Sequence, residues 1–256
     1  PPFGWGEAAP YPGQDEQIDD VVRAARASEW TTPTLAAALD EATVDREARN
    51  AGVSLGEVIG ASRDPLPISL AVGLSGSPIE HIERSIGERV RRFKLKIAPG
   101  HVDHVATIRE RYPTVLIGVD ANASFDVDTV HELAGLAGCD IAYLEQPVAD
   151  LGSRAARLVS ETVDIPVFAD ESVRSVADAQ EVLALPTVEG VVIKPGRLGW
   201  SGSLAVRELA GAAGKEWRAS GLLETGVGRA YTNLLAALPD ASICDVAPAS
   251  WFMEQD

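Results

Sequence analysis

The sequence predicts an α/β protein whose main part is a (β/α)8 barrel. From Pro67 onward, short β-branched or apolar runs alternate with polar amphipathic stretches, each long enough for a crossover helix. This alternation is typical of parallel strands joined by right-handed connections. The runs number eight, and eight nearly continuous apolar strands are what a closed barrel with a sheet buried on both faces requires.

The segment before the barrel, residues 14–62, shows the apolar spacing of helices rather than the alternation of strands. Two helices are predicted there, and Thr32-Pro33 supplies a cap and a first-turn proline for the second. Ahead of them, Pro1–Glu7 has the character of the end of an apolar strand. Because no Met precedes it and the chain stops soon after the apolar Ser250–Phe252, we expect further chain at both ends.

The barrel elements follow in order along the chain. The predicted strands are Ile68–Gly73, Phe93–Ile97, Val115–Val119, Ile141–Leu144, Val167–Ala169, Val188–Ile193, Ser220–Leu223 and Ser242–Val246. The predicted helices between them are Pro78–Arg91, His104–Tyr112, Val127–Ala137, Ser153–Thr162, Val176–Leu185, Ser203–Gly214 and Arg229–Leu238. An open doubly wound sheet is the alternative, but Gly73–Ser77 lacks the G-x-G-x-x-G turn that such a sheet usually carries.

Composition narrows the possible partners. The 256 residues include 22 Lys and Arg against 38 Asp and Glu, a formal net charge of −16. Such a surface repels phosphate backbones and anionic lipid, so nucleic-acid and membrane-surface roles are disfavoured. With only two cysteines, no long apolar run and no leader-like start, we expect a cytoplasmic protein with a small-molecule substrate. The sequence does not predict an oligomeric state.

Polar residues end five consecutive predicted strands at intervals of 24 or 25 residues, about one βα repeat. They are Lys96, Asp120, Glu145, Asp170 and Lys194. In a barrel these positions converge on the catalytic face. A single Asp after a strand is more often a helix cap, and a single Lys there is usually exposed. Five at one repeat length are far more improbable as a purely structural pattern.

This constellation suggests a metal-dependent reaction. Three carboxylates held together would repel one another and raise one another's pKa unless a cation lay among them. All three donors are hard oxygens, which favours Mg²⁺, with Mn²⁺ as the second choice, over zinc. The metal would hold a substrate carboxylate, one lysine would remove the neighbouring carbon-bound proton, and the metal would stabilise the resulting enediolate.

These residues resemble the enolase superfamily, specifically the branch of o-succinylbenzoate synthases and N-succinylamino acid racemases. The resemblance extends over about residues 66–255, and Lys-Pro-Gly-Arg favours this branch over muconate cycloisomerases and dipeptide epimerases. The matching motifs are Lys94-Leu95-Lys96, Asp120-Ala121-Asn122, Glu145-Gln146-Pro147, Asp170-Glu171-Ser172, Lys194-Pro195-Gly196-Arg197 and Leu223–Ala230. Trp200 departs from the family, which usually has a second glycine there.

The resemblance implies a barrel modified as in this superfamily over residues 66–256, with its C-terminal end incomplete. Residues 1–65 would then be part of an N-terminal α+β capping domain. It further implies Mg²⁺ ligands at Asp120, Glu145 and Asp170, and catalytic lysines at Lys96 and Lys194. In the same way, Lys94 would support Lys96, Glu171 would orient Lys194, and Asn122 and Arg197 are weaker candidates for positioning.

The expected activity is the dehydration of 2-succinyl-6-hydroxy-2,4-cyclohexadiene-1-carboxylate to o-succinylbenzoate, a step of menaquinone biosynthesis. Racemisation of an N-succinyl or N-acyl amino acid on the same site is the alternative, and the sequence does not separate the two. More distant alternatives are an aldolase-type barrel, in which a strand-end lysine forms a Schiff base, and a non-catalytic binding barrel.

Overall fold

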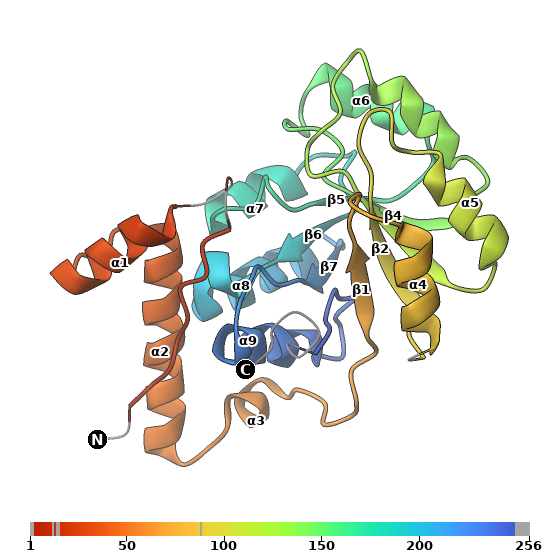
Figure 1. The fold of residues 1–256 in the computed structure, drawn as a ribbon. Coiled ribbons are helices and arrows are strands. Elements are labelled where there is room, and N and C mark those ends of the chain that lie inside the picture. The colour runs from red at the N-terminus through yellow and green to blue at the C-terminus, as the bar shows by residue number, and fades with distance from the viewer. Residues whose placement is uncertain (1–2, 12, 14–15, 88, 249–256) are drawn as a thin grey trace.

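A computed structural model describes residues 3–11, 13, 16–87 and 89–248 (Figure 1). Its centre is a parallel sheet whose strands follow chain order, so each strand pairs with the next. The strands are β1 Ser69–Val72, β2 Arg92–Lys96, β3 Leu116–Asp120, β4 Ile141–Glu145, β5 Val167–Ala169, β6 Gly190–Ile193 and β7 Glu216–Ala219. This order and the curl of the sheet confirm the predicted barrel architecture.

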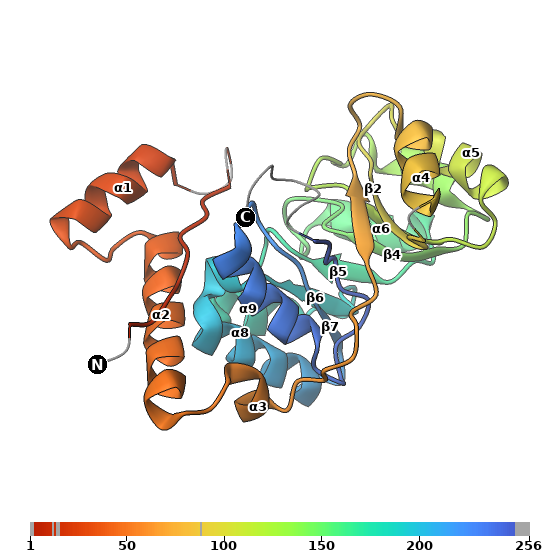
Figure 2. The same cartoon turned by 60° about the horizontal axis from the view of Figure 1, so that its bottom comes forward.

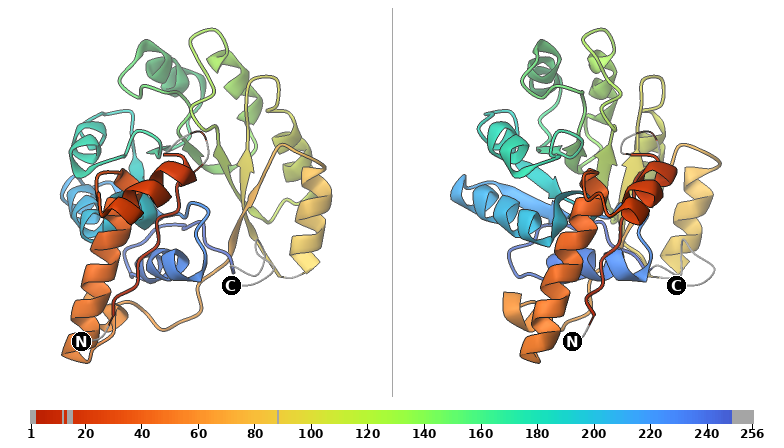
Figure 3. Two further views of the ribbon diagram at one scale, coloured as in Figure 1. Left: turned by 60° about the vertical axis from the view of Figure 1, so that its left-hand side comes forward. Right: turned by 90° about the vertical axis from the view of Figure 1, so that its left-hand side faces the viewer.

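Helices surround the sheet on its outer side (Figure 3). Those of the barrel are α4 Pro78–Gly87, α5 His104–Arg111, the 3-10 helix η1 Val130–Leu136, α6 Arg154–Thr162, α7 Val176–Leu183, α8 Pro195–Ala212 and α9 Gly226–Ala236. The N-terminal helices are α1 Ile18–Ala27, α2 Pro33–Ala51 and α3 Leu55–Ile59. Two of these were predicted, and α3 adds a short third that begins with a Ser54–Glu57 capping box. None of the described helices is long and apolar enough to cross a lipid bilayer.

The eighth position of the barrel is filled by a segment that forms only an isolated bridge. Within the predicted strand Ser242–Val246, the N–H groups of Ser242 and Asp245 donate to the carbonyls of Trp217 and Ala219 of β7, both at 3.0 Å. On the other side, the N–H of Ser69 in β1 donates to the carbonyl of Val246 at 3.0 Å. This segment, which we call the seam, therefore closes the ring between the last and first strands.

The seventh strand lies earlier than predicted. We expected it at Ser220–Leu223, but β7 is Glu216–Ala219. Its apolar pattern is interrupted by Arg218, which is 1% exposed and points into the barrel. There the guanidinium lies 3.4 Å from the ring centroid of Tyr143 and 3.6 Å from that of Phe168. Stacking on two rings compensates the buried charge, which is why an arginine occupies a position that sequence patterns assign to an apolar residue.

Two apolar layers hold the barrel together. Residues such as Leu95, Ile117 and Val191 face outward and pack against the helices as part of the main core cluster. Inside, Tyr143, Phe168 and Val192 form a smaller cluster. The inner rings need space opposite them, because a Cβ at Gly118 would lie 2.1 Å from Tyr143 Cζ and one at Gly190 2.3 Å from Phe168 Cε1. The barrel interior is therefore packed below the rim, and only the rim is open to a ligand.

The N-terminal helices lie on one side of the barrel, where α2 runs beside α8 and α1 projects away from it (Figure 2). The Asp40 carboxylate of α2 accepts from the N–H and the hydroxyl of Ser201, both at 2.8 Å. α8 is broken at Gly199, whose φ of 72° favours glycine. Trp200, the departure from the family, is buried against Tyr231 at a centroid distance of 5.7 Å.

The extended segment 3–11 joins this side to α9 through acidic side chains. The Glu7 carboxylate accepts from the Thr225 N–H at 2.6 Å, the Thr225 hydroxyl at 2.7 Å and the Gly228 N–H at 2.8 Å. Glu41 of α2, which is fully buried, accepts from the Glu7 N–H at 3.1 Å. We call Glu7, Glu41 and the buried Glu224 the acidic junction. No strand is seen in residues 3–7, where a strand end was predicted, and Pro1, Pro2 and Ser250–Phe252 lie outside the described residues.

Candidate active site

The predicted site residues lie at one rim of the barrel, as expected from their spacing. Lys96, Asp120 and Glu145 are the last residues of β2, β3 and β4, and the strand register pairs Lys96 with Asp120 and Asp120 with Glu145. Asp170 and Lys194 immediately follow β5 and β6. Because register partners on parallel strands point the same way, these side chains share the inner face of the rim.

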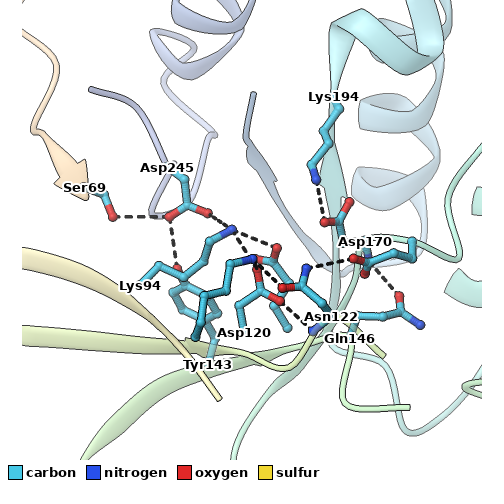
Figure 4. Close-up of polar contacts among 12 residues, drawn as sticks. Ser69, Lys94, Asp120, Asn122, Tyr143, Gln146, Asp170, Lys194 and Asp245 are labelled. Carbon is cyan, nitrogen blue, oxygen red and sulfur yellow. Dashed lines mark hydrogen bonds and ion pairs between the residues drawn. The ribbon is translucent and has the colours of Figure 1, made fainter. Parts of the chain in front are cut away.

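Lysines pair with the carboxylates at this rim (Figure 4). Lys96 Nζ donates to Asp120 Oδ2 at 2.6 Å and to Asn122 Oδ1 at 2.6 Å. Lys194 Nζ donates to Asp170 Oδ2, also at 2.6 Å. The Lys96 side chain is 27% exposed and the Lys194 side chain 10%, whereas their partners Asp120 and Asp170 are each 1% exposed. Lys96 is therefore the more accessible of the two lysines for a substrate.

Lys94 lies deeper than Lys96 and faces three acids. Its ammonium donates to Glu145 Oε1 at 2.9 Å and forms ion pairs with Asp245 Oδ2 at 2.8 Å and Asp120 Oδ2 at 3.3 Å. Burial lowers the pKa of Lys94, but the charges of Asp245, Glu145 and Asp120 raise it by more, to well above its usual value. Lys94 is thus a permanent cation beneath the rim.

The weaker candidates are also in contact with this group. Asn122 Oδ1 accepts a hydrogen bond from Lys96 Nζ, and Asn122 Nδ2 donates one to Glu171 Oε1 at 2.9 Å. Arg197 Nη1 donates to the carboxylate of Asp170 at 3.1 Å and to its backbone carbonyl at 3.2 Å. Asn122 links the Lys96 side of the rim to Glu171, while Arg197 reinforces the Lys194 side.

The loops that carry these residues hold unusual backbone conformations. Asn122, Ala123 and Gln146 have φ values of 43°, 60° and 35°. Gln146 stabilises its loop by accepting from the Asp170 N–H at 2.9 Å through Oε1 and by donating through Nε2 to the carbonyl of Val148 at 2.8 Å. Left-handed residues other than glycine cost free energy and are concentrated at functional sites, which is consistent with a catalytic rim here.

The three candidate metal ligands differ in the direction of their pKa shifts. Burial raises the pKa of Asp120, but Lys94 and Lys96 lower it by more, so the net shift is downward. The pKa of Asp170 is likewise lowered, because Lys194 and Arg197 outweigh its burial. Glu145 goes the other way: burial raises its pKa well above the usual value, and Lys94 compensates only in part. The expected rise from mutual repulsion is therefore confined to the glutamate.

The donors fit a divalent cation by their chemistry. All three are carboxylates, as Mg²⁺ prefers, and Glu145 Oε2 is buried with no hydrogen-bond partner among the described residues. Such a buried oxygen is available to a cation. Within the described ranges, no three His, Cys, Asp or Glu side chains are arranged as a group that could hold a metal.

A cavity of about 210 Å³ opens above this group. Its polar wall includes Lys96, Asp120 and Lys194, and its apolar wall includes Ala71, Leu222 and Leu223. A larger cavity of about 860 Å³ lies between α2, α3 and α9, and no candidate site residue lines it. The smaller cavity is therefore the candidate substrate site, because predicted site residues line it and none lines the larger one.

Sequence reasoning missed Asp245 and Tyr143. Asp245 Oδ1 accepts from the hydroxyls of Tyr143 and Ser69, each at 3.2 Å. A signal for Asp245 was present, because it is the sole acid within the predicted eighth strand. Tyr143 gave none, since an aromatic residue in a strand is ordinarily packing.

The family model described as Enolase C-terminal domain-like matches residues 79–256. The o-succinylbenzoate synthase of Bacillus subtilis is 32% identical over 225 residues, which cover 86% of this chain and 61% of that protein. The N-succinylamino acid racemase of Thermus thermophilus is 32% identical over 252 residues, covering 95% of this chain and 68% of the racemase. The chain thus spans about 60% of the Bacillus relative.

Among solved structures, an enolase superfamily member from Listeria innocua superposes with a TM-score of 0.86. It is 22% identical, and the match covers 97% of this chain and 75% of that one. At this identity the likeness concerns the fold. The resemblance inferred from the strand-end motifs is confirmed.

Proposed function

The chain belongs to the enolase superfamily of enzymes, and we propose that it acts as an o-succinylbenzoate synthase. The supporting observation is the rim itself, where five polar residues lie at or directly after the ends of consecutive strands: Lys96, Asp120, Glu145, Asp170 and Lys194. Of these, Lys96, Asp120 and Lys194 line one small cavity. Superfamily members use Mg²⁺ as a general rule. We assign Asp120, Glu145 and Asp170 as its ligands here and residues 1–65 as part of a capping domain. The proposed substrate is the cyclohexadiene carboxylate of menaquinone biosynthesis.

Lys96 is the proposed base. It is the more exposed lysine, and Asp120 and Asn122 fix its ammonium with two hydrogen bonds of 2.6 Å. In neutral form it would take the proton from the carbon next to the substrate carboxylate, and as the resulting ammonium it would give that proton to the departing hydroxyl, which leaves as water. When bound, Mg²⁺ would supply a Lewis acid for the substrate carboxylate.

Lys194 is the proposed cation on the other side of the cavity. Its Nζ donates to Asp170 Oδ2 and Arg197 donates to Asp170 Oδ1, so the Asp170 carboxylate directs Lys194 to the rim. A Schiff-base reaction would leave the three carboxylates of the rim without a role, so that alternative has less support. The apolar wall of Ala71, Leu222 and Leu223 would contact the substrate ring.

Racemisation of an N-succinylamino acid is the second candidate, and the Thermus relative favours it specifically. Both reactions begin with removal of a proton next to a carboxylate. They differ at Lys194, which must deliver a proton to the opposite face in racemisation but only supply positive charge in dehydration. Lys194→Arg keeps the charge and removes an effective acid, so it separates the two roles.

The test is an assay of both substrates with Mg²⁺, with EDTA, and with Mg²⁺ restored after EDTA. We expect dehydration to disappear on chelation and to return with the metal. Lys194→Arg should retain more of the dehydration rate than of the racemisation rate. Dehydration that is insensitive to EDTA, or a parent enzyme with racemisation alone, would contradict the synthase assignment.

A further inference from the structure

Asp245 connects the rim to four strands although it belongs to none of them. Its backbone N–H donates to the carbonyl of Ala219 in β7. Its Oδ1 accepts from the hydroxyls of Ser69 in β1 and Tyr143 in β4, and its Oδ2 lies 2.8 Å from the Nζ of Lys94 in β2. The side chain is 7% exposed. A carboxylate so enclosed is fixed in place by its partners, and the adjoining Lys94 ammonium offsets the cost of burying its charge.

The Lys94 ammonium lies between Asp245 and the candidate metal ligands (Figure 4). On one side it contacts Glu145 and Asp120, and on the other it contacts Asp245. Asp245 Oδ1 accepts from the Ser69 and Tyr143 hydroxyls, and Oδ2 forms the ion pair with Lys94. Asp245 is therefore placed to balance Lys94 rather than to ligate a metal.

Charge makes this balance necessary. The side-chain contacts of the rim join the cations Lys94, Lys96, Lys194 and Arg197 to the acids Asp120, Glu145, Asp170 and Asp245. With all eight groups ionised their charges cancel, so loss of Asp245 would leave one excess positive charge before any metal arrived. A buried ammonium beside Glu145 would then both repel a divalent ion and compete with it for the same oxygens.

We propose that Asp245 is a positioning residue for the Mg²⁺ site, whose carboxylate neutralises Lys94 and so lets Glu145 and Asp120 bind the ion. This inference rests on the proposed function, because it takes those two acids as metal ligands. The seam that closes the barrel would thus set the metal affinity of residues on β3 and β4.

The experiment measures Mg²⁺ binding by titration calorimetry in the absence of substrate. Asp245→Asn keeps the shape and removes the charge, and we expect the Kd for Mg²⁺ to rise by about 10- to 100-fold, as for other residues behind metal ligands. Ser69→Ala is the matched control, since it removes a hydrogen bond to the same carboxylate but no charge, and its Kd should stay close to that of the parent.

A double variant, Lys94→Met with Asp245→Asn, distinguishes charge balance from mere closure of the barrel. It removes both charges, so the metal affinity should recover most of the loss seen with Asp245→Asn alone. If Asp245→Asn fails to fold because it leaves Lys94 short of one counter-charge, the double variant should fold and bind Mg²⁺. A purely structural role predicts that the double variant is no better than the single one.

The outcomes separate this inference from the proposed function. Unchanged Mg²⁺ affinity in folded Asp245→Asn, in a parent that binds the ion and dehydrates the substrate, overturns the role of Asp245 alone. A double variant as weak as the single variant does the same. A parent that binds no Mg²⁺ overturns the proposed metal site as well.

Discussion

The rim of the barrel and the acidic junction both bury a group of carboxylates, but they neutralise them differently. At the rim, Asp120 and Asp170 face lysines at 2.6 Å, and their pKa values are lowered. At the junction, Glu41 receives a backbone N–H, and Glu224 has the guanidinium of Arg229 only at 3.9 Å. Burial there raises the pKa of Glu41 to about 8 and also raises that of Glu224.

The difference teaches that nearby cations, and not burial itself, decide whether a buried acid is charged. Glu145 makes the same point within the rim, because it shares its only lysine, Lys94, with two other acids and its pKa is raised. Acids paired with lysines at the rim suit metal binding, whereas the raised pKa values of Glu41 and Glu224 favour neutral side chains where the N-terminal segment docks. Four experiments test this contrast.

The largest expected effect is at the rim. Lys96→Met removes the proposed base, and the dehydration rate should fall by about 10³-fold, within the range for a positioned acid or base. Steady-state kinetics gives the rate, and calorimetry should show that Mg²⁺ still binds. Lys215→Met is the control, because Lys215 directly precedes β7, at the end of the strand away from the rim. Its ammonium donates to the Leu185 carbonyl. A variant that retains a tenth of the parent rate contradicts the role of Lys96.

At the junction, Glu41→Gln should remove a pH dependence of stability. The pKa of Glu41 is about 8 in the folded chain against an ordinary 4.5, so between these values the folded state binds more protons than the unfolded state. Stability is therefore lost as pH rises through this window, by about 5 kcal/mol in total for this group. Urea unfolding at several pH values should show Glu41→Gln more stable than the parent at pH 8 and similar to it at pH 5. If the free energies of unfolding of the parent and of Glu41→Gln change with pH in parallel, Glu41 is not neutral in the folded chain.

A smaller effect is expected at Glu7. Its carboxylate accepts hydrogen bonds from Thr225 and Gly228 at the start of α9, where a negative charge is favourable. Glu7→Gln should lower the free energy of unfolding by about 1 to 2 kcal/mol. Chemical denaturation measures this, and high salt should reduce the difference because screening weakens the contact of charge and dipole. No change in stability would show that the segment is held by other contacts.

The smallest effect concerns the hydroxyl of Thr225, which donates to Glu7 at 2.7 Å. Thr225→Ala should cost about 1 kcal/mol. Combined with Glu7→Gln, the two losses should be less than additive, because both act through one hydrogen bond. Strict additivity in the double-mutant cycle would show that the two residues act independently.

The sequence predicted the positions of site residues that recur once in each βα repeat. Five rim residues recur at one βα repeat, so Lys96 to Lys194 were found from spacing alone. The junction has no such period, since Glu7, Glu41 and Glu224 meet only through the packing of three unrelated segments. β7 was misplaced because Arg218 breaks its apolar pattern, and stacking of a guanidinium between two rings cannot be read from a linear sequence.

The seam also orders events during synthesis of the chain. Lys94 leaves the ribosome long before Asp245, and until then the first and seventh strands have no common neighbour. A nascent barrel that lacks residues 242–246 exposes the hydrogen-bonding edge of β1 and leaves Lys94 short of one counter-charge. The seam therefore completes both the cylinder and the charge balance at its rim, so that a chain stalled before residue 242 would be open to proteolysis and self-association.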